Sequence, residues 1–147
     1  MAIEAIIFDW VGTLYDRGKD MLFPYSEKVL EKLAQKYKLA IISKAVPDSI
    51  ETKLKQMDGI IKYFKVIKAG VDKTPEQYIE CMDKLKVKPG NTLVVGDKDL
   101  GGVQIGKKLG CKTAWVQIGK YSHEIQDKKT GYHNYKIKTI EGLLKVL

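Results

Sequence analysis

Short apolar runs alternate along the chain with segments in which apolar residues recur at helical spacing. Runs typical of buried strands occupy residues 3–8, 39–42, 64–67, 92–95 and 112–116, with a short sixth candidate at 135–137. Helices are predicted at residues 24–37, 48–57, 75–85, 100–107 and 139–147, and loops at 15–23 and 117–134. Strands that alternate with helices predict an α/β fold: one domain over residues 1–147, with a parallel sheet of about five strands and helices on both faces.

Several of these helices carry recognisable start signals. Thr74, Pro75 and Gln77 combine an N-cap hydroxyl, a proline in the first turn and a glutamine at the capping-box position. Asp48 and Glu51 have the same box spacing. These signals predict helix starts near residues 48 and 74.

Composition narrows the class of protein. The chain has 147 residues, 44% of them hydrophobic and 30% charged, as expected for a globular domain. Its apolar runs are too short for a membrane span, and Met1 to Glu4 lack the basic start of a signal peptide, so we expect neither an anchor nor a signal peptide. Two cysteines in apolar contexts, Cys81 and Cys111, favour a reduced, cytoplasmic protein.

The net charge of +8 comes almost entirely from dispersed lysines. Such a surface favours anionic substrates. Nucleic-acid binding is left open but not favoured, because Arg17 is the only arginine and exposed aromatic residues are scarce between the lysines.

Polar side chains follow the ends of three predicted strands. Asp9, Ser43 and Asp97 occupy these positions, and Lys73 lies on the loop before a helix. Parallel sheets bind ligands beyond the carboxyl ends of their strands, so we expect these side chains to converge. Two carboxylates, a hydroxyl and an ammonium suit phosphoryl transfer. Taken singly, each residue also fits an ordinary turn or helix cap.

The turn after Asp9 adds further candidates. Gly12 permits a sharp backbone turn, and Thr13 offers a hydroxyl and an N–H near Asp9. This strand end could therefore hold an anion or a cation.

Four motifs in order resemble the haloacid dehalogenase-like hydrolase superfamily. They are Phe8-Asp9-Trp10-Val11-Gly12-Thr13-Leu14, Ile41-Ile42-Ser43, Asp72-Lys73-Thr74-Pro75-Glu76 and Val94-Val95-Gly96-Asp97. The resemblance covers almost the whole chain and implies a Rossmann-like domain without a cap domain.

The resemblance also implies roles in a phosphatase reaction. Asp9 would be the nucleophile that forms an aspartyl-phosphate, Ser43 and Lys73 would bind and neutralise the phosphoryl group, and Gly12 and Thr13 would help to bind it. Mg²⁺ would be held by the Asp9 carboxylate, the Val11 carbonyl and Asp97. The substrate would be a phosphorylated small molecule or macromolecule, and the open site of capless members leaves homo-oligomerisation as an option.

Two positions depart from the family pattern. Val11 stands where phosphatases usually carry a second Asp that acts as general acid and base, a loss that typically costs about 10²–10⁴-fold in rate. Asp16 is the nearest replacement by sequence. Gly101 stands where a further acid is common, and Asp99 is the candidate substitute metal ligand. Phosphonatases, which also lack the second Asp, need a helical cap for which residues 14–24 are too few.

Two functions therefore remain open from the sequence. One is a Mg²⁺-dependent phosphohydrolase that is slow or restricted to good leaving groups. The other is a catalytically impaired phosphate-binding or interaction module.

Overall fold

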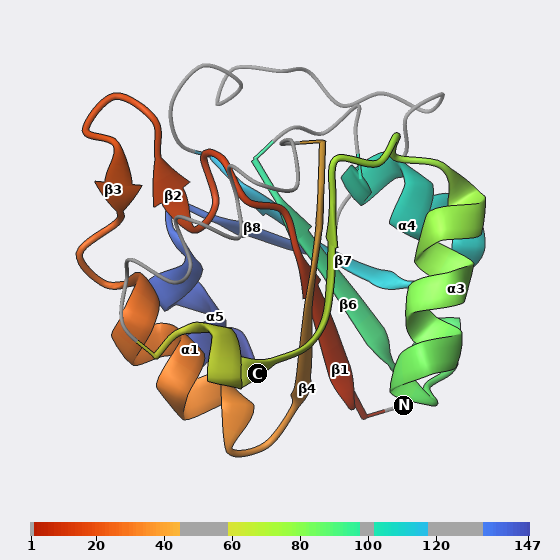
Figure 1. Cartoon of the computed structure of the whole chain (residues 1–147). Helices are drawn as coiled ribbons and strands as arrows, with labels where there is room; N and C mark the ends of the chain where they lie inside the picture. The colour runs from red at the N-terminus through yellow and green to blue at the C-terminus, as the bar shows by residue number, and fades with distance from the viewer. Residues whose placement is uncertain (1, 45–58, 98–101, 118–133) are drawn as a thin grey trace.

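A parallel sheet of six strands forms the centre of the structure (Figure 1). The computed structural model describes residues 2–44, 59–97, 102–117 and 134–147. The strands are β1 (Ala5–Phe8), β4 (Lys38–Ser43), β5 (Phe64–Ala69), β6 (Thr92–Gly96), β7 (Lys112–Val116) and β8 (Tyr135–Ile137), in the spatial order β5-β4-β1-β6-β7-β8. All neighbouring pairs are parallel. This confirms the predicted α/β fold, with the short candidate strand at 135–137 as its sixth member.

Helices cover both faces of the sheet, as β1 illustrates. Ile6 and Phe8 belong to the core on the side of α1 (Ser26–Ala34) and α5 (Leu143–Val146). Ala5 and Ile7 belong to the core on the side of α3 (Pro75–Leu85), with α4 (Gln104–Leu109) packed against it. Figure 1 shows these two helix pairs on opposite sides of the strands. Because successive side chains of a strand point to opposite faces, a central strand buried on both sides must be apolar throughout.

The start of α3 follows its sequence signals. The Thr74 hydroxyl accepts a hydrogen bond from the Gln77 backbone N–H at 3.4 Å, and Pro75 is the first helical residue. The next predicted helix is present where the chain is described, because π-helical residues 102 and 103 lead directly into α4. Leu100 and the predicted helix at 48–57 lie outside the described residues.

Residues 15–23 were predicted to be a loop, but they contain a small hairpin. Its strands β2 (Tyr15–Asp16) and β3 (Met21–Leu22) pair antiparallel. Asp16 Oδ1 accepts a hydrogen bond from the Gly18 N–H at 3.0 Å, and the Tyr15 hydroxyl donates to the Asp20 carboxylate. Two-residue strands are too short to produce a periodic pattern, so the prediction missed them.

The C-terminal segment is only partly the predicted helix. A 3₁₀ turn, η5 (Ile140–Gly142), begins after Thr139, whose hydroxyl accepts from the Glu141 N–H at 3.3 Å, and α5 follows it. Leu143 is buried and Leu144 is 39% exposed.

Two other 3₁₀ turns, η1 (Ile61–Tyr63) and η2 (Pro89–Asn91), lead into β5 and β6. Within the described parts of the chain, every helix is too short or too polar to cross a bilayer.

Candidate active site

The strand order brings the predicted site residues to one place. Asp9 follows β1, Ser43 ends β4 and Asp97 follows β6, and β1 lies between the other two strands. The chain first adds β4 and β5 on one side of β1 and then crosses to add β6 on the other. The carboxyl edge between β1 and β6 is therefore the topological switch point, where open α/β sheets bind their ligands.

The Asp9 carboxylate is held in a fixed orientation. Its Oδ1 accepts hydrogen bonds from the Trp10 backbone N–H and the Lys73 ammonium, both at 2.8 Å. Its own backbone N–H donates to the Val95 carbonyl at 2.9 Å. The Lys73 and Asp9 side chains are only 13% and 17% exposed. A charge-assisted contact with so little solvent is stronger than a surface ion pair, so Lys73 aligns the carboxylate and partly neutralises it.

The second carboxylate, Asp97, is buried beside the first. Burial raises its pKa to about 7, and the negative charge of Asp9 and a hydrogen bond with it act in the same direction, while Lys73 opposes them. The indole Nε1 of Trp115 on β7 donates to the Asp97 backbone carbonyl at 3.0 Å and holds this strand end. Two adjacent carboxylates in a poorly solvated site are stable only with a proton or a cation between them.

The close approach of the first loop to Asp97 depends on Gly12. Its backbone has φ +81°, and a Cβ atom there would lie 2.1 Å from Asp97 Oδ2. The loop is closed by hydrogen bonds from the Leu14 N–H to the Trp10 carbonyl and from the Gly12 N–H to the Tyr15 carbonyl, both at 2.9 Å. The loop after β1 can therefore pack directly against Asp97 because Gly12 has no side chain.

The other candidate residues at this end of the sheet, Thr13, Ser43 and Val11, are buried or half-buried. Thr13 is fully buried, and no described group bonds its hydroxyl. Ser43 is 3% exposed at the end of β4. Val11 is half-buried and packs against the core on the α1 side. An apolar side chain thus occupies the position at which the resemblance leads one to expect a second acid.

Asp16 and Asp99 are the two acids that could replace the missing ones. Asp16 lies on the hairpin, where it accepts the Gly18 hydrogen bond. Burial raises the pKa of Tyr25 to about 12, and the charges of Glu141 and then Asp16 add to this rise. None of the hydrogen bonds and ion pairs among the described residues joins Asp16 to Asp9. Asp99 lies outside the described residues.

The donor set at this edge fits Mg²⁺ better than a soft metal. Within the described ranges, no three His, Cys, Asp or Glu side chains cluster as a complete metal cage. Mg²⁺ prefers oxygen ligands and usually keeps several waters with only one or two carboxylates. Asp9 and Asp97, with a backbone carbonyl such as that of Val11, satisfy this preference.

Tyr78 is a neighbour of the site that the sequence analysis did not assign to it. It is buried on α3, its pKa is raised by burial and by the charge of Asp9, and its hydroxyl lies 2.1 Å from where a Cβ on Gly102 would be. In the sequence it looks like an ordinary apolar helix position, so no pattern singled it out.

Comparison with known proteins identifies the family. The chain belongs to the haloacid dehalogenase-like hydrolases, whose family model matches residues 9–116. It is 33% identical over 79 residues to a glyceraldehyde 3-phosphate phosphatase of Pyrococcus furiosus, a match that covers 53% of this chain and 32% of that relative. The predicted membership of a hydrolase family is confirmed, and the matched region is about a third of the relative's length.

Solved structures of related fold span more than one chemistry. A phosphatase of this family from Thermococcus onnurineus has a TM-score of 0.79 at 18% identity, covering 98% of this chain and 97% of its own. An L-2-haloacid dehalogenase has a TM-score of 0.81 at 16% identity, covering 99% of each chain. At these identities the likeness establishes the fold, and the reaction must be argued from the site residues.

Proposed function

We propose that the chain is a Mg²⁺-dependent phosphohydrolase that acts on phosphate monoesters through an aspartyl-phosphate at Asp9. The observation that carries the proposal is the oriented carboxylate of Asp9, with the Lys73 ammonium at 2.8 Å and Asp97 beside it at the switch point of the sheet. The glyceraldehyde 3-phosphate phosphatase similarity and the net charge of +8 support a phosphorylated, anionic substrate.

The first step is attack by an Asp9 carboxylate oxygen on phosphorus. The new O–P bond forms as the bond from phosphorus to the ester oxygen breaks, and the leaving oxygen departs with the electron pair. Lys73 neutralises charge on both Asp9 and the phosphoryl oxygens, and the Ser43 hydroxyl donates to one of those oxygens. Gly12 and Thr13 shape the loop beside the site: their backbone N–H groups donate to the Tyr15 and Trp10 carbonyls, at 2.9 and 3.3 Å, and would bind a phosphoryl oxygen only by exchanging those bonds.

The second step is hydrolysis of the acyl phosphate. Water attacks phosphorus, the bond from phosphorus to the Asp9 oxygen breaks, and inorganic phosphate leaves with Asp9 regenerated. With Val11 in place of an acid, the leaving oxygen takes its proton from solvent or from Asp16, and the attacking water loses its proton to solvent. Leaving groups of low basicity are therefore the favoured substrates.

Asp9, Asp97 and the Val11 carbonyl would hold Mg²⁺, with Asp99 as a further candidate. The ion would offset the negative charge of the phosphoryl oxygens and of the two carboxylates. Cys81 and Cys111 are both buried and unpaired, which supports the proposed cytoplasmic location.

The first test is hydrolysis of p-nitrophenyl phosphate, whose phenolate is a good leaving group. We expect turnover that requires Mg²⁺ and is lost in Asp9→Asn but kept in Asp83→Asn, which removes an exposed carboxylate on α3. Acid quenching during turnover should leave one phosphoryl group on the peptide that contains Asp9. Retained turnover in Asp9→Asn would refute the nucleophile assignment.

A second candidate function is a phosphate-binding module without turnover. The observation that favours it is the packing of Val11 against the core where an acid would be needed. Orthovanadate binding that requires Mg²⁺ and Lys73, together with no hydrolysis above the Asp9→Asn background, would select this function over the first.

A further inference from the structure

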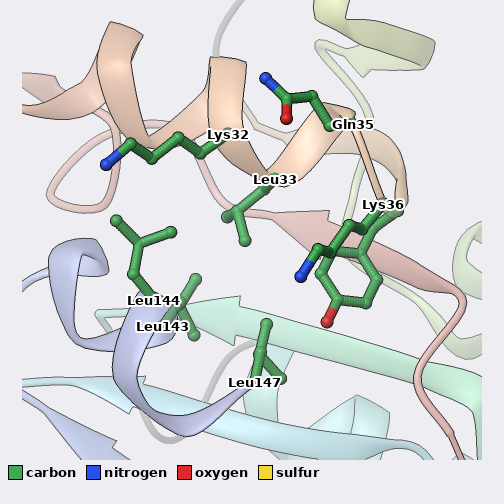
Figure 2. Close-up of a pocket in the computed structure, with 8 residues that line it drawn as sticks. Lys32, Leu33, Gln35, Lys36, Leu143, Leu144 and Leu147 are labelled. Atoms are coloured by element: carbon green, nitrogen blue, oxygen red, sulfur yellow. The ribbon is translucent and has the colours of Figure 1, made fainter.

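A pocket lies between the end of α1 and the C-terminal helix, apart from the site already described. Its volume is about 460 Å³, and it is lined by Lys32, Leu33, Gln35, Lys36, Tyr37, Leu143, Leu144 and Leu147. Figure 2 shows the leucines of α5 and Leu147 directed toward Leu33 of α1 across the gap. Leu144 remains 39% exposed although it borders this pocket, so the apolar floor is not fully covered by the described chain.

Both charged side chains that line the pocket are lysines. Lys32 is exposed in the last turn of α1 and Lys36 is exposed in the turn that follows the helix, and the lining includes no Asp or Glu side chain. Neither lysine is in an ion pair with a described carboxylate. The pocket therefore combines an apolar floor with two cations that are available to a ligand.

The apolar floor and the two lysines indicate which kind of ligand would fit the pocket. A second copy of the chain, packed through the same patch, would add two more lysines and no Asp or Glu side chain to pair with them, which is unfavourable. A docked peptide helix contacts its groove through several turns, whereas this pocket has a volume in the range of about 300–1,000 Å³ typical of small-molecule sites. We propose that it binds a small amphiphilic carboxylate, with the apolar part on the leucines and the carboxylate at Lys32 and Lys36.

The pocket is far from the phosphohydrolase site in the fold. Ser26, at the start of α1, donates a hydrogen bond at 2.8 Å to the Leu14 carbonyl in the loop after β1, whereas the pocket is at the other end of α1. An adjoining hollow of about 350 Å³ shares Lys36 and Tyr37 and reaches Ile3 and Lys38, at the amino ends of β1 and β4. The two sites thus lie at opposite edges of the sheet, and binding at one is testable without activity at the other.

The test is calorimetric titration of the full chain with decanoate, below its micelle-forming concentration and at constant ionic strength. We expect one decanoate per chain. The double variant Lys32→Gln/Lys36→Gln should weaken binding at least tenfold, and Leu144→Glu should abolish it. Decyltrimethylammonium, with the same chain and the opposite charge, should not bind.

Matched variants elsewhere on the surface serve as controls. Lys28→Gln removes a cation of α1 outside the pocket, and Ile79→Glu places a carboxylate at a 45% exposed apolar position on α3. Both should bind decanoate as the unaltered chain does, and circular dichroism should show all variants folded. Equal affinity in the pocket and control variants would overturn the proposal. Tighter binding of an acidic amphipathic peptide, lost in the same pocket variants, would also overturn it, in favour of a protein partner.

Discussion

Replacing Gly12 with alanine tests whether the loop after β1 needs a residue without a side chain. Gly12 has φ +81°, and an alanine Cβ would lie 2.1 Å from Asp97 Oδ2. The Asp97 side chain cannot easily move away from this Cβ, because Asp97 is only 8% exposed and its backbone carbonyl is bonded by Trp115. We expect Gly12→Ala to destabilise the fold and to displace Asp97.

The size of the effect follows from two terms. The left-handed backbone conformation costs a residue with a Cβ about 1–2 kcal/mol. Moving Asp97 off its preferred rotamer costs about 0.5–1.5 kcal/mol more. Together these terms give about 1.5–3.5 kcal/mol in the free energy of unfolding, or a fall of about 3–14 °C in Tm for a domain of this size.

Gly18→Ala provides the matched control, because it lies in the same loop region. Its φ is not in the left-handed range, and an added Cβ would meet only Asp16 Oδ1, at 3.4 Å. Both substitutions reduce the entropy of the unfolded chain equally, so their difference isolates the strain in the native state. Urea unfolding with EDTA present, which removes any contribution of bound metal, measures that difference.

Equal stability of the two alanine variants would refute the structural argument. An intermediate result is also informative, since a Gly12→Ala variant that is destabilised but keeps its Mg²⁺-dependent turnover would show that Asp97 can move without loss of function. That outcome would contradict the role proposed for Asp97 in holding the metal.

Three further predictions concern other contacts. Trp115→Phe removes the donor to the buried Asp97 carbonyl and should lower the free energy of unfolding by about 1–3 kcal/mol; an unchanged urea midpoint would contradict this. Burial raises the pKa of Cys81 to about 12 and that of Cys111 to about 11, so both thiols should resist dithionitrobenzoate at pH 8 until the chain unfolds, and prompt native-state labelling would refute their burial. Because the unfolded chain loses these protons at lower pH, stability should fall as pH rises above about 9. Val11→Asp should raise turnover of alkyl phosphates more than that of p-nitrophenyl phosphate, and an equal change for both would argue against a missing general acid.

Local patterns determined most of the architecture. The fully buried residues of β1 appear in the sequence as an uninterrupted apolar run, which is typical of a parallel strand covered on both faces. The start of α3 was readable because the Thr74 cap and Pro75 act within one helical turn. The order of the four motifs was sufficient for the family, and the family model confirms it.

The short and irregular elements could not be predicted from the hydrophobic pattern. The β2–β3 hairpin carries side-chain hydrogen bonds of Asp16 and Asp20, and a short 3₁₀ turn precedes α5. Such segments are too short for a hydrophobic period to emerge, so contacts with the rest of the fold decide their conformation.

The sequence by itself determined which residues end the strands and hence that Asp9, Ser43 and Asp97 would share an edge of the sheet. Only the tertiary structure decided that Gly12 meets Asp97 and that a pocket opens beside Leu144. The physical reason is that apolar periodicity records burial along one element at a time. Contacts between groups far apart in the chain depend instead on strand order, register and side-chain packing, which no local pattern encodes.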